Sequence, residues 1–275
     1  MKIKLFKSLA VLMVFLTGYV SAQTTETEPR DLFYDEQRVR ENIALPYDYV
    51  SESDVYWHRR VWRVIDVKEK MNLPFRYEGL DWKNLSPFIT TLRDAALSNE
   101  VTMYDDENFK RPLLAADVQK RGAGFDTIMM LDLDGNPTRD TVIEHPFNPN
   151  NVLHWRVKED WFFNKKTSQM QVRIMGIAPL YFDEEAKIEY PLFWVYYPGV
   201  RNLLARAEVF NPKNDAQRWS FEDILEMRMF SSTIIKESNV FDRRIQEYAT
   251  GIDALRESDR VKDDIFTYEH DLWSF

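Results

Sequence analysis

The stretch from Val152 to Leu180 constrains the fold most strongly, because its residues predict two β-strands joined by a tight turn. The polar cluster Asn164–Thr167 would form the turn, between runs of β-branched, aromatic and alternating residues. Side chains alternate across a strand, which predicts one apolar face in the second strand, made of Met170, Val172, Ile174, Gly176 and Ala178. The opposite face would carry Gln171, Arg173, Met175 and Ile177. We expect this hairpin to be buried, either in its own domain or against a partner.

Two further segments predict strands. Pro191–Tyr197 is short, aromatic and bounded by Pro191 and Pro198, which favours a strand beside the hairpin. At 125–144, the turn residues Asp134-Gly135-Asn136 lie between two apolar runs and predict a second hairpin. The central sheet is therefore predicted to be small and mostly antiparallel.

Helices are predicted around this sheet. Asp54–Met71 has apolar residues at helical spacing and ends in charged residues before Pro74, although a strand over its first half also fits a period of two. Other helices are predicted at Ser86–Leu97, from Ser220, at Val240–Tyr248 and at Ile252–Phe266. Gly251 would end the helix before it.

The helix from Ser220 begins with a capping-box pair, Ser220 and Asp223. Four of its residues are predicted to face the core: Phe221, Ile224, Leu225 and Met229. The chain ends in an aromatic segment, Tyr268–Phe275, which we expect to be docked on the domain.

The first 22 residues predict a secretory signal peptide. A basic start is followed by a short apolar run and by a small-residue cleavage site between Ala22 and Gln23. The chain has no cysteine, so it can form neither a disulfide nor the lipid-modified cysteine of a lipoprotein. We expect an exported protein with an extended arm at 23–50 and one α+β domain at 51–275, whose small antiparallel sheet is built on the 152–180 hairpin and flanked by helices. The arm would lie either over the surface of its own domain or over a neighbouring subunit, since an extended segment with isolated aromatic residues suits both.

Charge argues against nucleic acid as a partner. Removing residues 1–22 takes away three lysines and no acidic residue, which leaves 33 basic and 45 acidic residues and a formal net charge of -12. A polyanion would be repelled by that average field.

Residues that would carry catalysis are not arranged in any specific pattern. The four histidines, at 58, 145, 154 and 270, lack the spacing of a zinc site, and neither a phosphate-binding glycine loop nor a nucleophile elbow occurs. Asp132, Asp134 and Asn136 alternate like calcium ligands, but glycine comes fourth rather than sixth and position twelve is Ile143. No catalytic, cofactor-binding or metal-binding residue is predicted.

Aromatic residues are abundant instead, at 39 of 275, and many lie beside arginine, as in Tyr197–Arg201. Aromatic and arginine side chains are enriched in protein interfaces and their hot spots, although a large core without disulfides would also use the rings. The candidate interface residues are Trp57, Arg59, Trp62, Arg63, Asp160, Trp161, Phe162, Phe163, Trp194 and Trp273. If Trp161 is a hot spot, Trp161→Ala should cost about 2 kcal/mol or more in assembly and leave the monomer folded.

Six strings carry a resemblance to a known family: residues 61–74, 157–180, 193–198, 208–216, 228–245 and 268–273. They are similar, in the same order, to the gliding motility GldN family, also called PorN, or to its close paralogue GldO. The resemblance spans roughly Asp54–Phe275 and is weakest before Tyr49 and over 99–150.

The resemblance implies a periplasmic component of the type IX secretion system of the Bacteroidetes, at the inner face of the outer membrane. Family members form a ring with the lipoprotein GldK (PorK) and contact the periplasmic parts of the motor proteins GldL and GldM (PorM). The family supplies no catalytic residue and no cofactor.

Two other function classes stay open on the residues alone. A periplasmic hydrolase would show a pocket with two converging carboxylates or a histidine of strongly perturbed pKa. A monomeric ligand-binding carrier would show one large apolar pocket.

Overall fold

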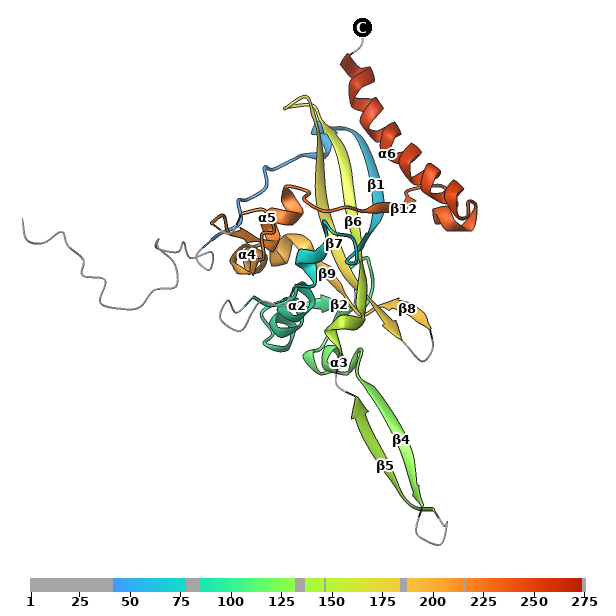
Figure 1. Cartoon of the computed structure of the whole chain (residues 1–275). Helices are drawn as coiled ribbons and strands as arrows, with labels where there is room; N and C mark the ends of the chain where they lie inside the picture. Colours follow the sequence, from blue (N-terminus) through green and yellow to red (C-terminus); the bar gives the residue numbers. More distant parts are fainter. Residues whose placement is uncertain are drawn as a thin grey trace, which may run out of the picture. The chain divides into compact units, whose positions relative to one another are not determined.

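The computed structural model describes residues 42–77, 85–131, 137–145, 147–183, 187–214 and 216–273 (Figure 1), which all belong to one compact unit. The strands are β1 (Val55–Asp66), β2 (Met103–Tyr104), β3 (Pro112–Leu113), β4 (Gly124–Leu131), β5 (Pro137–His145), β6 (Val152–Asn164), β7 (Gln169–Asp183), β8 (Ile188–Pro191), β9 (Trp194–Tyr196), β10 (Glu208–Val209), β11 (Trp219–Ser220) and β12 (Thr233–Glu237). The helices are α2 (Phe88–Leu97), α3 (Ala115–Lys120), α4 (Tyr197–Arg206), α5 (Phe221–Glu226) and α6 (Ile252–Trp273).

The long hairpin β6–β7 is the centre of the main sheet, as its sequence predicts. The strand order is β12-β1-β6-β7-β9-β2-β3, with β8 paired to β7, and every pairing is antiparallel. The segment Pro191–Tyr197 supplies β9 and its flanks beside β7, as expected. The α+β fold with a mainly antiparallel sheet is confirmed.

The prediction of a helix at Asp54–Met71 is wrong, because Val55–Asp66 forms the inner strand β1. One edge of β1 pairs with β6 along nearly its whole length, and the other pairs with β12. Trp62, for example, lies opposite Lys158 on one side and Lys236 on the other. The spacing of apolar residues within the segment fitted both a helical period and a strand period of two, and pairing with distant strands decided between them.

The predicted faces of β7 hold only over its first half. The register shifts between Lys158 and Glu159, where Lys158 lies opposite Gly176 and Glu159 lies opposite Ile174. Such a bulge reverses the alternation. Ile174 and Ile177 therefore both join the main hydrophobic core, while Ala178 packs on the other face with Trp62 and Trp194.

Gly176 lies beside the bulge, where Phe109 approaches the sheet. A Cβ at Gly176 would lie 2.6 Å from Cζ of Phe109, so the loop that carries this ring would have to move. We expect Gly176→Ala to lower the free energy of unfolding by about 1–3 kcal/mol, the usual cost of overpacking. Urea denaturation would measure this change.

The matched control is Gly199→Ala in α4, where the added Cβ would make only an ordinary contact with Tyr196 at 3.4 Å. Alanine favours a helix more than glycine does, so this variant should be neutral or more stable. Equal stability losses for the two variants would contradict the proposed close approach of Phe109.

The main core lies against one face of the sheet and is covered by α2, α4 and α5. Trp155 of β6 is its largest fully buried side chain and contacts the ring of Phe88 from α2, with centroids 4.4 Å apart. The ring of Phe221 from α5 lies 4.8 Å from the same Phe88 ring. Helix α2 confirms the prediction at Ser86–Leu97, whereas α4 was not anticipated from the sequence.

Helix α5 begins as predicted, with the capping box of Ser220 and Asp223. Its apolar residues Phe221, Ile224 and Leu225 are buried, and Met229, which follows the helix, packs at the edge of the core.

The C-terminal region departs from prediction at Val240–Tyr248, which is irregular apart from a 3-10 turn at Ile245–Glu247. Gly251 has φ +60° and precedes α6, so it does not end a helix. Helix α6 confirms the prediction at Ile252–Phe266 and continues to Trp273. The end of the chain is docked as expected up to Tyr268, whose ring stacks on Trp57 at 4.7 Å.

The predicted hairpin at 125–144 is present as β4 and β5, which pair only with each other in the described sheets. Three other predictions lie outside the described residues: the signal peptide with Ala22 and Gln23, the arm before residue 42, and the calcium-like turn at 132–136.

Candidate interaction surfaces

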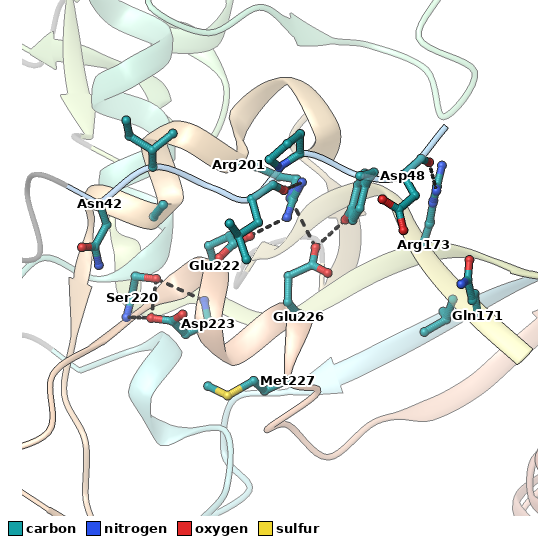
Figure 2. A pocket seen from close by; sticks show the side chains of 16 residues that line it. Asn42, Asp48, Gln171, Arg173, Arg201, Ser220, Glu222, Asp223, Glu226 and Met227 are labelled. Atoms are coloured by element: carbon teal, nitrogen blue, oxygen red, sulfur yellow. Dashed lines mark hydrogen bonds and ion pairs between the residues drawn. The ribbon is translucent and has the colours of Figure 1, made fainter. Parts of the chain in front are cut away.

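Residues 42–50, here called the arm segment, run without regular structure over α4, α5 and β7. Figure 2 shows side chains from all three elements turned toward this segment. A pocket of 630 Å³ lies between the arm segment and the domain. The described part of the predicted arm therefore packs on its own chain.

Arg201 of α4 holds the arm segment at one point. Its Nη1 donates a hydrogen bond of 2.7 Å to the carbonyl oxygen of Leu45, and its Nη2 donates one of 2.7 Å to Glu222 Oε1. Its Nε lies 3.4 Å from Glu226 Oε1 (Figure 2), and the side chain is only 9% exposed. The fixed fork of guanidinium donors lets Arg201 bind two carboxylates and a backbone carbonyl together.

Tyr47 forms the centre of the contact. Its ring centroid lies 3.8 Å from Cζ of Arg201 and 4.9 Å from Cζ of Arg173 on β7. Its hydroxyl donates to Glu226, and burial together with this bond raises the pKa of Tyr47, so the hydroxyl stays a neutral donor. Arg173 Nη2 also donates to the carbonyl oxygen of Asp48 at 2.5 Å.

Glu222 and Glu226 are two converging carboxylates, the arrangement that a hydrolase would need. Burial raises the pKa of Glu222, although the bond from Arg201 opposes that shift. Both carboxylates contact groups of this chain: Glu222 accepts a hydrogen bond from Arg201, and Glu226 accepts one from Tyr47 and lies beside Arg201. We call Arg173, Arg201, Glu222 and Glu226 the arm socket.

A second group of charges is buried between the sheet and α6. Glu159 of β6 is fully buried, and its Oε2 accepts bonds of 3.0 Å from Arg63 Nε and from Trp161 Nε1. Nη2 of Arg228 lies 3.0 Å from Oε1 of the same carboxylate. Burial lowers the pKa of Arg63. One carboxylate thus neutralises two guanidinium groups, and we call these four residues the buried charge cluster.

Trp161 is one of the predicted interface residues, and its surroundings change the expected effect of its removal. The ring packs with the small core under α6, and the guanidinium groups of Arg63 and Arg228 lie 5.8 and 5.2 Å from its centroid. Trp161→Ala would remove these contacts and a donor to Glu159. We therefore expect Trp161→Ala to lower monomer stability as well; that it weakens assembly and leaves the monomer folded stays a prediction.

Asp160 lies on the opposite face of β6. Its carboxylate accepts two bonds from Arg60, of 2.6 and 2.7 Å, and Nε2 of His58 lies 3.3 Å away. Burial alone would raise the pKa of Asp160, but Arg60 outweighs it and holds that pKa below its usual value. Asp160 and His58 line a groove of 550 Å³ together with Phe162 and Arg173.

Three other predicted interface residues, Trp62, Phe162 and Trp194, are buried within the chain. Trp62 donates its Nε1 to Glu107, and Trp194 packs with it and with Ala178. Contacts within the fold therefore account for the burial of these three rings.

The remaining candidates are only partly buried or undescribed. Trp57 stacks on Tyr268, Arg59 pairs with Glu237 at 3.1 Å, and Phe163 is half-buried on β6 opposite Trp57. The side chain of Trp273 lies outside the described part of the chain. Whether any of these residues contacts a partner stays a prediction.

The sequence did not single out an exposed apolar patch around the start of α6. Its members are Val240, Phe241, Tyr248, Ile252 and Leu255. The guanidinium of Arg243 lies 4.5 Å from the centroid of Phe241 and 5.6 Å from that of Tyr248. The helix predicted over Val240–Tyr248 would have placed some of these side chains against the core, so the sequence did not indicate that they are exposed.

His154 of β6 ties the strand β8 to the sheet. Its Nδ1 lies 2.5 Å from Glu189 Oε1, and its Nε2 lies 3.7 Å from Asp66 Oδ2. The bond with Glu189 raises the pKa of His154 above its usual 6.5. The contribution of this contact to the free energy of unfolding is therefore complete below about pH 6.5, and it is lost as pH rises through the folded-state pKa of His154.

We expect Glu189→Gln to lower the pKa of His154 toward 6.5, because the neutral amide no longer favours the protonated ring. Titration of the histidine ring signals by NMR would measure it. Glu100→Gln, an exposed position after α2, serves as the control and should change nothing. An unchanged His154 titration in Glu189→Gln would show that Glu189 does not set that pKa.

Two kinds of site are absent from the described residues. In that part of the chain, no helix combines the length and apolarity needed to span a membrane. Nor do the described side chains gather three or more histidines and carboxylates as metal ligands.

Comparison with known proteins places these surfaces in context. The family model described as gliding motility associated protein GldN matches residues 50–274. This range includes the whole main sheet, the arm socket and the buried charge cluster, but only the last residue of the arm segment. No curated protein matches the chain. Because the match covers most of its length, the chain belongs to the GldN family of gliding motility associated proteins.

Proposed function

We propose that this chain is a structural subunit of the type IX secretion system. Its family is associated with gliding motility and secretion. The chain would reside in the periplasm, assemble into a ring with a GldK/PorK-like lipoprotein beneath the outer membrane, and contact the periplasmic domains of the GldL/GldM motor. Secretion and gliding would both depend on it.

The family match over residues 50–274 carries this proposal. Three features of the chain support it. The first residues predict export, the absence of cysteine means that a lipoprotein partner would have to hold the protein at a membrane, and the converging carboxylates of the arm socket bind the chain itself. The apolar patch around Phe241 offers surface for a partner.

The test is gentle detergent extraction of the cell envelope from cells that carry a tagged full-length chain, followed by size-exclusion chromatography. We expect elution in a very large particle together with an outer-membrane lipoprotein. A monomer-sized peak, under extraction conditions that preserve other envelope complexes, would overturn the proposal.

A further inference from the structure

We propose that the arm socket receives the arm segment of a second copy of this chain when copies assemble, so that neighbouring subunits exchange arms. This inference rests on the proposed function, because it needs an assembly of copies. The exchange would preserve every contact described for the arm segment and would make those contacts between subunits.

The socket recognises an extended peptide rather than a particular fold. Arg201 and Arg173 donate to the backbone carbonyl oxygens of Leu45 and Asp48, and Tyr47 inserts between them with its hydroxyl on Glu226. Figure 2 shows these side chains meeting the segment from α4, α5 and β7. The bound ligand is therefore a short segment without regular structure that inserts one tyrosine, Tyr47, and any copy of the chain carries it.

The two residues that connect the arm segment to its own domain, Tyr49 and Val50, are weakly held. Among the described residues, no hydrogen bond or ion pair links Tyr49 or Val50 to the rest of the chain, and Tyr49 is 85% exposed. Ile43 and Leu45 are also 73% and 80% exposed, although they belong to a segment that lies on the protein. Residues 49–50 can therefore act as a hinge, and packing within one chain leaves the apolar side chains of the arm uncovered.

The socket is also not filled by the segment that occupies it, since the pocket of 630 Å³ lies beside Ile43 and Leu45. Arg173 lines this pocket and also the second groove of 550 Å³, which is lined by Val50 and Phe162. A lifted arm would leave the guanidinium donors and carboxylates of the socket free for an incoming segment.

Exchange of an identical element between copies is a low-cost route to assembly, because the same contacts form in both states. In a free subunit, the tether gives the chain's own arm a high effective concentration, so the socket stays closed. In a closed assembly, the neighbouring arm is held nearby as well, so it can occupy the socket in place of the chain's own arm.

The chain contains no cysteine, which allows an unambiguous cross-linking test. The amide nitrogen of Ala44 lies 3.2 Å from Oδ1 of Asn202, so this pair marks the seated arm. Two full-length chains with different tags, one carrying Ala44→Cys and the other Asn202→Cys, would be expressed together. The purified large particle and the monomer fraction would each be treated with a short bismaleimide and analysed on denaturing gels.

We expect a cross-linked dimer with both tags in the large particle and none in the monomer fraction. Adding Tyr47→Ala to the Ala44→Cys chain should reduce this dimer about tenfold or more, as expected for loss of a central anchor. Leu114→Ala is the control and should leave the yield unchanged, because Leu114 is 73% exposed and lies outside both the arm segment and the arm socket. Ala44→Cys paired with Glu100→Cys, which is outside the socket, should give no dimer.

A chain carrying both Ala44→Cys and Asn202→Cys provides the opposing measurement. If it cross-links within itself in the large particle, and the co-expressed single variants give no dimer there, arm exchange is overturned and the proposed function stands. If no large particle forms at all, the proposed function fails, and the inference fails with it.

Discussion

Glu159→Gln is expected to lower the free energy of unfolding by about 3–5 kcal/mol, which corresponds to a melting temperature about 10 °C lower for a domain of this size. The amide keeps the shape of the side chain but removes the negative charge that Arg63 and Arg228 both contact. Arg63 is only 6% exposed, so water cannot replace that charge. Urea and thermal unfolding of the purified chain would measure the loss.

The control for this prediction is Glu237→Gln, which breaks the ion pair with Arg59. Those two side chains are 22% and 33% exposed, and such pairs usually contribute no more than about 1 kcal/mol. If the two glutamine variants lose the same stability, the charge cluster under α6 is not a buried one in solution.

Trp155→Ala is expected to cost about 3–5 kcal/mol, because it empties the centre of the main core. The ring is 1% exposed and packs on Phe88 of α2, so its removal leaves a cavity between the sheet and the helices. Denaturant unfolding followed by tryptophan fluorescence and by circular dichroism would report the loss, with seven tryptophans still present as probes.

Phe241→Ala is the matched aromatic control. This ring is 73% exposed in the apolar patch, and its truncation should change monomer stability by no more than about 0.5 kcal/mol. A large destabilisation by Phe241→Ala would mean that the 238–248 segment is packed in solution, contrary to the structure.

The sequence alone predicts only some of the features on which these predictions depend. Nothing in the sequence pairs Glu159 with Arg63 or Arg228. The three residues come from β6, β1 and the segment after α5, and a buried ion cluster becomes visible only when those segments are brought together. The arm socket was missed for the same reason, although the run Tyr197–Arg201 had drawn notice as aromatic residues beside arginine.

What the sequence determined by itself was local. The turn at Asn164–Thr167 and its flanking alternation defined the β6–β7 hairpin, the pair Ser220 and Asp223 defined the start of α5, and helical spacing defined most of α6. Each depends on residues a few positions apart, where turn chemistry, capping or periodicity dominates.

Only the tertiary structure decided that Val55–Asp66 is a strand, that β7 reverses its faces at the bulge, and that Val240–Tyr248 is irregular. The sequence of β1 fitted a helical period as well as a period of two, and its partners on β6 and β12 lie about 100 and 170 residues away in the chain. The free energy of those distant pairings exceeds the small differences in local propensity, and no pattern within the segment records it.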